Sequence, residues 1–351
     1  MAAGRKGKSV GQAIAITTLT PVRQPRKLGL RLRIVRCVPA FGRPLDQLAF
    51  IYFARWTIIE RLPPAQPLHT PYLLFESNFD GGWVQYLDAF ADRLPYRISL
   101  LWRTCYGYDE AVLKRARGDR FPPGRFKQFV DENELRVLHF YAAYPDATTR
   151  MVRNAIALDG RHDSLDDDVT ATLALGPAEP PRAWPRSLAR TAGAWWRNVT
   201  RRYGVQPLTL ALPLDAEAAD DVARRLDELD QESSPLADVP GTHFARFVLV
   251  PQRLIALGQP QPDVLAHPYL LFTSNHDGKR SDYLEALAVA AGWVWEACAD
   301  RPAAPDATWL ASHEIGTRYF VLGFPPRTVD EVKRLLRRRR ETAEAIARVA
   351  A

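Results

Sequence analysis

The chain repeats itself, and this duplication constrains its fold more than any other feature. The phrase PYLLFESNFDGGWVQYLDAF at 71–90 recurs as PYLLFTSNHDGKRSDYLEAL at 268–287, with 12 of the 20 aligned residues identical. A shorter phrase, FARW at 53–56, recurs as FARF at 244–247. Repeats of this kind indicate two copies of one structural unit that bury apolar surface against each other.

Hydrophobic periodicity predicts nearly the same order of elements in both copies. The segment 26–38 fits either a strand or a helix. Thr328 and Glu331 form a T-x-x-E capping box at the start of the closing helix. The other predicted strands are 13–20, 52–59, 72–77 and 135–143 in the first copy and 208–212, 243–250, 269–274 and 318–324 in the second, with helices at 80–94, 148–158, 216–229 and 282–299.

This order is that of a β-α-β-β-α-β ferredoxin-like unit with a trailing helix. The helices of one unit cover one face of its sheet, so the other face needs a partner. We therefore predict an α+β fold in which two ferredoxin-like βαββαβ repeats face each other as an intrachain α+β barrel. The predicted domains are a first repeat at 1–160, a linker with an amphipathic Trp/Arg helix at 161–204, and a second repeat with a basic C-terminal helix at 205–351.

Both copies carry Ser-Asn-x-Asp-Gly between a strand and a helix, with Asp80-Gly81 in the first and Asp277-Gly278 in the second. A polar loop at a strand end can form a functional site. Alternatively, Asp caps a helix, Gly turns the backbone, and Ser and Asn satisfy free backbone amides. Retention in both halves favours the structural interpretation, because a single active site rarely needs the same loop twice.

Each copy also places one arginine, Arg55 or Arg246, inside an apolar strand. Such an arginine can hold an anion in a cavity between the sheets. It can instead form an ion pair with a carboxylate at the rim, such as Asp80 or Asp277 of the other copy. We favour the ion pair, because buried arginines generally need partners.

Histidines mark the differences between the copies. His276 replaces Phe79, and His243 replaces Tyr52. His139 lies on the last strand of the first copy, and His313 precedes the last strand of the second. Imidazole titrates near neutral pH and binds metals and haem. No His-x-x-His or His–carboxylate cluster accompanies these residues, so an ordinary polar role is the default for each.

Composition and motifs exclude several classes of function. The three cysteines are far apart and form no Cys-x-x-Cys pair, which excludes a disulfide scaffold and a thiolate zinc site of usual spacing. The N-terminus does not resemble a signal peptide, so we expect a cytoplasmic protein. Phosphate-binding loops, Gly-x-Ser-x-Gly and His-Glu-x-x-His are all missing, so nothing indicates a kinase, a dehydrogenase or a hydrolase.

The net charge of +7 comes from three basic segments, at 1–45, 182–202 and 333–340. On a helical wheel, residues 183–203 place tryptophans opposite arginines, as in a helix that lies on a membrane surface. The alternative is an amphipathic helix packed on the barrel. No recognised nucleic-acid module is present, which argues against nucleic acid as a partner. The candidate residues for an anionic membrane surface are Trp184, Arg190, Trp195, Trp196, Arg197 and Arg201.

Two fused units of this kind resemble the dimeric α+β barrel superfamily. That group includes dye-decolourising peroxidases, chlorite dismutases and small cofactor-free monooxygenases. The peroxidases carry a Gly-x-x-Asp-Gly loop, and only its last two residues match here, at Asp80-Gly81 and Asp277-Gly278. Ser77 and Ser274 replace its first glycine.

The resemblance implies a haem-dependent, peroxidase-like oxidoreductase. Its axial ligand would be His276, followed by His313 and His139, with Arg246 and Asp277 as catalytic residues. One alternative is a non-catalytic binding or scaffold protein at a membrane surface. Another is a cofactor-free oxygenase that acts on a small hydrophobic molecule in a cavity between the sheets.

Overall fold

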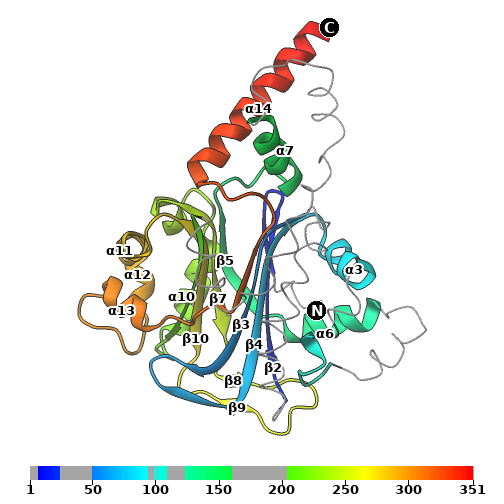
Figure 1. Cartoon of the computed structure of the whole chain (residues 1–351). Helices are drawn as coiled ribbons and strands as arrows, with labels where there is room; N and C mark the ends of the chain where they lie inside the picture. Colours follow the sequence, from blue (N-terminus) through cyan, green and yellow to red (C-terminus); the bar gives the residue numbers. More distant parts are fainter. Residues whose placement is uncertain are drawn as a thin grey trace, which may run out of the picture.

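The computed structural model describes residues 7–23, 50–93, 99, 101–108, 123–159 and 204–350. In this part of the chain two antiparallel sheets face each other, and helices cover their outer faces (Figure 1). The segment predicted at 26–38, the Trp/Arg segment at 183–203 and Cys37 lie outside the described residues.

The two sheets have related but unequal strand orders. The first sheet is ordered β1-β2-β4-β3-β11, and the second is ordered β5-β7-β10-β6. The strands of the first sheet are β1 (Lys8–Val10), β2 (Ala13–Pro21), β3 (Ile51–Leu62), β4 (Gln66–Asp80) and β11 (Tyr319–Leu322). Those of the second are β5 (Arg136–Ala142), β6 (Val205–Pro213), β7 (Thr242–Val250) and β10 (Tyr269–Asp277).

Each half of the chain contributes its last strand to the sheet of the other half. β5 pairs along its length with β7, and β11 pairs with β3. Single bridges, Thr18 to Glu134 and Leu210 to Glu314, connect these regions back to their own halves. The two sheets therefore close into one barrel, which confirms the predicted intrachain α+β barrel.

Three hydrophobic clusters fill the layers of this structure. One lies between the sheets, one lies between the first sheet and its helices, and one lies between the second sheet and its helices. The covering helices are α3 (Trp83–Arg93) and α6 (Pro123–Asn133) on the first sheet, and α10 (Ala219–Glu228), α11 (Arg280–Ala290), α12 (Gly292–Trp295) and α13 (Ala307–Ser312) on the second.

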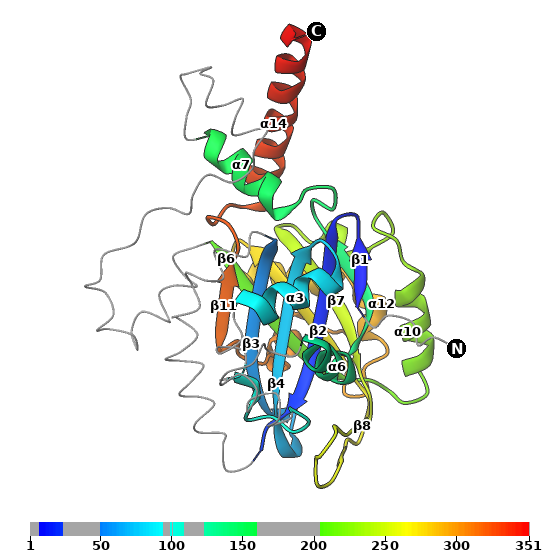
Figure 2. The same cartoon turned by 90° about the vertical axis from the view of Figure 1, so that its right-hand side faces the viewer.

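Two further helices, α7 (Thr149–Asp159) and α14 (Val329–Ala350), pack against each other at one end of the barrel. α14 begins at the predicted capping box, where Thr328 N donates to Glu331 Oε2 at 2.8 Å and Glu331 N donates to Thr328 Oγ1 at 3.2 Å. Val332 and Leu335, in the first turns of α14, are buried and join the hydrophobic cluster between the sheets. Figure 2 shows the C-terminal part of α14 projecting away from the barrel, whereas the basic segment 333–340 lies closer to it and contains the buried Leu335.

Most predicted strands and helices are present, with small shifts at their ends. The helix predicted at 282–299 is broken into α11 and α12 around Ala291 and Gly292. α6 and α13 were not predicted, since both are short and follow segments with weak periodicity. The short elements β8 (Arg253–Leu254), β9 (Asp263–Val264) and η3 (Pro235–Asp238) complete the described structure.

The exchanged strands predict that neither half folds alone as a monomer. Residues 205–351 without β5 leave the β7 edge unpaired, and an exposed strand edge favours association or unfolding. We expect this fragment to be unfolded or dimeric by light scattering and circular dichroism. A monomeric fragment that unfolds cooperatively in urea would contradict the expectation.

Candidate functional site

The repeated Ser-Asn-x-Asp-Gly loops have a structural role in both halves. Asp80 Oδ2 accepts a hydrogen bond from Thr149 N at 2.6 Å, and Asp277 Oδ2 accepts one from Val329 N at 2.6 Å. Each aspartate thus caps the helix that follows the last strand of its repeat, rather than the helix next in sequence. Gly81 and Gly278 turn the backbone at φ +94° and +83°, a region that favours glycine.

Arg55 and Arg246 lie between the two sheets, and each reaches across to the opposite one. Arg55 donates to Leu208 O at 2.6 Å, Thr209 Oγ1 at 3.1 Å, Ser274 O at 2.5 Å and Asn275 Oδ1 at 2.5 Å. We call this set and its counterpart around Arg246 the arginine clasp.

Arg246 repeats the same four hydrogen bonds in the opposite direction. It donates to Ile16 O at 2.7 Å, Thr17 Oγ1 at 3.0 Å, Ser77 O at 3.2 Å and Asn78 Oδ1. Burial lowers the pKa of Arg246 to about 10, so the side chain remains protonated at neutral pH. The serine and asparagine of the repeated loop are therefore the docking site for the arginine of the other half.

Glu76 breaks the symmetry of the clasp. Its carboxylate lies 3.2 Å from Arg55 Nε and accepts hydrogen bonds from Thr17 at 3.3 Å and Thr273 at 2.9 Å. The residue aligned with Glu76 in the second copy is Thr273. The clasp thus contains two guanidinium groups, of Arg55 and Arg246, and one buried carboxylate, of Glu76.

The expected ion pairs of the arginines with the rim carboxylates Asp80 and Asp277 are wrong, and the hydrogen bonds of Arg246 go to neutral acceptors. Arg55 does form an ion pair, but with Glu76 inside the barrel, whereas Asp80 and Asp277 cap helices. The space beside the clasp is filled by aromatic rings, with Tyr52 and Phe53 centred 4.9 and 5.7 Å from Phe244. In the described residues, side chains therefore occupy the place where an inter-sheet substrate cavity was expected.

His276 and Arg246 do not form a common site. It is fully buried on the outer, helix-covered face of the second sheet, where its ring stacks on Tyr283 at 3.9 Å. Phe79 stacks on Tyr86 in the same way at 3.8 Å in the first half. Burial, helped by the charge of Arg55, lowers the pKa of His276 to about 3, so the ring is neutral.

The other candidate histidines occupy three separate places. His139 Nε2 lies 2.7 Å from Ser234 Oγ, and burial lowers its pKa to about 4. His313 Nε2 lies 2.8 Å from Asp300 Oδ2 at the end of α13. His243 Nδ1 lies 3.0 Å from the Tyr144 hydroxyl, and burial lowers its pKa as well.

These residues do not fit a haem site. His276 and Arg246 are on opposite faces of one sheet, and Asp277 caps α14. His276 Nε2 has no hydrogen-bond partner. The ring is stacked and fully buried, and it lines neither the aromatic pocket of the first half nor the two grooves at the seams of the barrel. Within the described residues, no three His, Cys, Asp or Glu side chains are grouped to hold a metal ion. Nor is any described helix long and apolar enough to cross a membrane.

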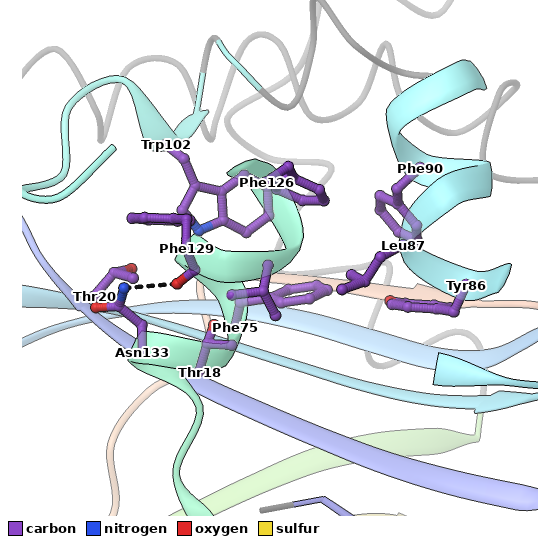
Figure 3. A pocket seen from close by; sticks show the side chains of 11 residues that line it. Thr18, Thr20, Phe75, Tyr86, Leu87, Phe90, Trp102, Phe126, Phe129 and Asn133 are labelled. Atoms are coloured by element: carbon purple, nitrogen blue, oxygen red, sulfur yellow. Dashed lines mark hydrogen bonds between the residues drawn. The ribbon is translucent and has the colours of Figure 1, made fainter. Parts of the chain in front are cut away.

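An aromatic pocket lies between the outer face of the first sheet and the helices α3 and α6 (Figure 3). It encloses about 10 Å³. Figure 3 shows rings from α6 and from the segment between the helices on one side and side chains of α3 on the other. The lining residues are Thr18, Thr20, Phe75, Tyr86, Leu87, Phe90, Trp102, Phe126, Phe129, Val130 and Asn133.

The second half has no polar floor at the corresponding place. Thr18 pairs with Phe75 in the first sheet, and Leu210 pairs with Phe272, the aligned residue, in the second. By the same register Leu212 stands where the first half has Thr20. Leu210 and Leu212 are fully buried in the outer core of the second half. The polar floor of the pocket therefore belongs to the first half.

Two open grooves lie at the seams of the barrel. One, of about 780 Å³, runs between β2 and β5 past Val137 and Leu249, and the other, of about 450 Å³, runs past Ile58 and Thr317. Leu249 and Ile58 are aligned in the repeat, so the two grooves are related by the internal symmetry. We attribute both to the way the two sheets meet, rather than to a site particular to one half.

Sequence reasoning missed Glu76 and the floor of the pocket. A signal for Glu76 is present in the sequence, because the phrases PYLLFESN and PYLLFTSN of the two copies differ at a single position, which is Glu76 in the first and Thr273 in the second. Thr18 and Thr20 could have been found by comparing the first strands of the copies. That comparison needs the strand register, since these strands show little identity.

No family model matches the chain, and no curated protein matches it. A solved structure from Fusobacterium nucleatum subsp. nucleatum, described as a "putative monooxygenase", covers 91% of this chain and 97% of its own at 8% identity and a TM-score of 0.33. Another with that description, from Lactobacillus acidophilus, covers 89% and 97% at 6% identity and a TM-score of 0.32. Likenesses this distant carry no information about activity.

The clasp predicts a large stability loss on removal of Arg55. Arg55→Met leaves Glu76 without its bonded guanidinium and four acceptors without their donor. We expect the free energy of unfolding to fall by about 3–5 kcal/mol, the usual cost of breaking a buried ion pair from one side. Urea unfolding measures this, with the exposed Arg253→Met as control, which should change it by less than about 0.5 kcal/mol. Equal effects of both substitutions would contradict the role of the clasp.

The buried neutral histidines predict sensitivity to acid. Because the pKa of His276 is lower in the folded state than its ordinary value of 6.5, the unfolded chain takes up the proton first. Stability attributable to His276 is therefore complete above pH 6.5 and is lost as the pH falls towards 3, by roughly 3 kcal/mol at pH 4. His276→Phe, which copies Phe79, should remove this part of the loss in urea unfolding at pH 7, 5 and 4.

The reverse substitution is the matched control. Phe79→His should add acid sensitivity at the corresponding place in the first half. An unchanged pH dependence in His276→Phe would show that this ring is not a source of the acid effect.

Proposed function

We propose that the protein binds a small hydrophobic molecule in the aromatic pocket and acts on it as a cofactor-free oxygenase. The observation that carries the proposal is the difference between the halves. The fold needs both outer faces covered, and in the second half apolar side chains do this without a polar floor. The first half instead has hydroxyls beneath a group of aromatic rings.

The lining favours a flat, apolar ligand. Five of its members are Phe or Trp rings, which offer large contact surfaces at low cost in side-chain entropy. The enclosed space of about 10 Å³ is close to the size of one water molecule, so a larger ligand enters as the rings of α3 and α6 repack. Van der Waals packing holds these helices on the sheet, and rotamer changes of such rings leave the strand ladder intact.

The lining also limits the chemistry. It contains no carboxylate, histidine, lysine or cysteine, and its one titratable group is Tyr86, whose pKa is raised by burial. General acid–base catalysis at neutral pH therefore has little support from these side chains. The proposed oxygenase step therefore depends on a substrate that is itself electron-rich enough to reduce dioxygen, such as a hydroquinone.

Binding of naphthalene tests the proposal. We expect saturable binding by equilibrium dialysis, together with a change in tryptophan fluorescence that is reduced in Trp102→Phe. Leu87→Phe should fill the pocket and weaken binding about tenfold, a loss of 1.4 kcal/mol. Leu284→Phe makes the same change at the aligned position of the second half and should leave the affinity unchanged. Absence of binding, or equal loss in both variants, would refute the site.

The oxygenase step needs a separate measurement. With 1,4-dihydroxynaphthalene and ¹⁸O₂, one oxygen atom enters the ring to give 2-hydroxy-1,4-naphthoquinone and the other leaves as water, the substrate itself supplying the electrons. We expect ¹⁸O-labelled product above the uncatalysed rate in the wild type and Leu284→Phe, and near the uncatalysed rate in Leu87→Phe, whereas unlabelled 1,4-naphthoquinone with hydrogen peroxide would be simple oxidation and would contradict the oxygenase step. If the ligand binds but no labelled product forms above the uncatalysed rate, the protein binds the ligand without catalysing its oxygenation, and the enzymatic part of the proposal is wrong.

A further inference from the structure

The floor of the aromatic pocket contains a hydroxyl group that the protein itself does not use. Thr18 lies on β2 with 2% of its surface exposed, and its Oγ1 has no hydrogen-bond partner. Burying a hydroxyl without a partner costs free energy that a methyl group of similar size would not cost. Threonine at this position therefore needs an explanation beyond packing.

The neighbouring polar groups differ from Thr18 in this respect. Thr20 Oγ1 donates to Leu73 O at 3.1 Å, and Asn133 Nδ2 donates to Phe129 O at 2.8 Å. Figure 3 shows the Asn133 bond at one end of the pocket, with Thr18 below the rings near Phe75. The Tyr86 hydroxyl lies near Ser77 but makes no hydrogen bond of normal geometry. Of the two threonines of the floor, Thr18 is thus the one whose hydroxyl has no partner, and the Tyr86 hydroxyl on α3 is a second unpaired group of the lining.

The second half shows that the fold does not require this hydroxyl. Leu210 occupies the same place in the register, paired with Phe272 as Thr18 is paired with Phe75. Leu210 is fully buried and packs in a continuous apolar core. An aliphatic side chain is therefore compatible with this point of the barrel.

We propose that Thr18 is a specificity-determining residue that recognises a hydrogen-bonding oxygen on an aromatic ligand. The inference rests on the proposed binding function and narrows its ligand class to flat aromatic molecules that carry one hydroxyl or carbonyl group. The rings hold the aromatic body, and the Thr18 hydroxyl donates to or accepts from the oxygen. A ligand without that oxygen leaves Thr18 unpaired and binds more weakly.

Two probes of similar size test this assignment: 1-naphthol and 1-methylnaphthalene. In the wild type we expect 1-naphthol to bind about five- to tenfold more tightly, the effect of one neutral hydrogen bond. In Thr18→Val, which keeps the shape of the side chain, the two affinities should become equal. The affinity for 1-methylnaphthalene should stay within about twofold of the wild type.

Thr242→Val is the control, because Thr242 is buried in the second half, outside the pocket, and its hydroxyl already donates to Val239 O at 2.8 Å. It should keep the preference for 1-naphthol. Loss of the preference in Thr242→Val but not in Thr18→Val would overturn the assignment to Thr18. Equal binding of both probes by the wild type would overturn the ligand class while leaving the proposed binding function intact. If neither probe binds, the binding function fails and this inference fails with it.

A measurement without ligand supports the same point independently. Replacing an unpaired buried hydroxyl with a methyl group should raise the urea midpoint of Thr18→Val above that of the wild type. Thr20→Val should lower the midpoint, since it removes a hydrogen bond. A lower midpoint in Thr18→Val would show that the hydroxyl has a structural partner.

Discussion

The reciprocal arginine clasp holds the two sheets of the barrel together. Two charged side chains lie between the sheets, where desolvation makes an unpaired guanidinium very costly. Arg55 and Arg246 are tolerated there because each finds four acceptors on the opposite sheet. Because these acceptors belong to the other half, either half without its partner would leave its arginine uncompensated.

The repeated loop has a different purpose from the one its sequence suggests. Asn78 and Asn275 receive the arginines, while Asp80 and Asp277 cap the helices that follow the exchanged strands. One short motif thus docks the opposite half and begins the next helix. This explains why both copies retain it, and why neither copy needs it for chemistry.

Symmetry explains the scaffold, and departures from symmetry indicate where function lies. Glu76 in place of Thr273 adds a carboxylate that pairs with Arg55 and accepts hydrogen bonds from Thr17 and Thr273 inside the clasp. His276 in place of Phe79 exchanges one stacked ring for another. Thr18 in place of Leu210 is different, because its unpaired hydroxyl lines a pocket of aromatic rings, whereas the unpaired Nε2 of His276 does not line that pocket.

The duplication, the α+β class and all the longer described strands follow from the amino-acid sequence alone, because periodicity and repetition are local; the short strands β1, β8 and β9 do not. The sequence also predicted the capping box at Thr328 and the structural use of the repeated loops. Which side chains contact each other depends on the packing of the two sheets. In the tertiary structure the last strands are exchanged, His276 is separated from Arg246, the space between the sheets is filled and Thr18 is left unpaired. Sequence spacing cannot report these outcomes, because the face on which a strand residue lies, and what stands opposite, depends on register and bulges between segments distant in the chain.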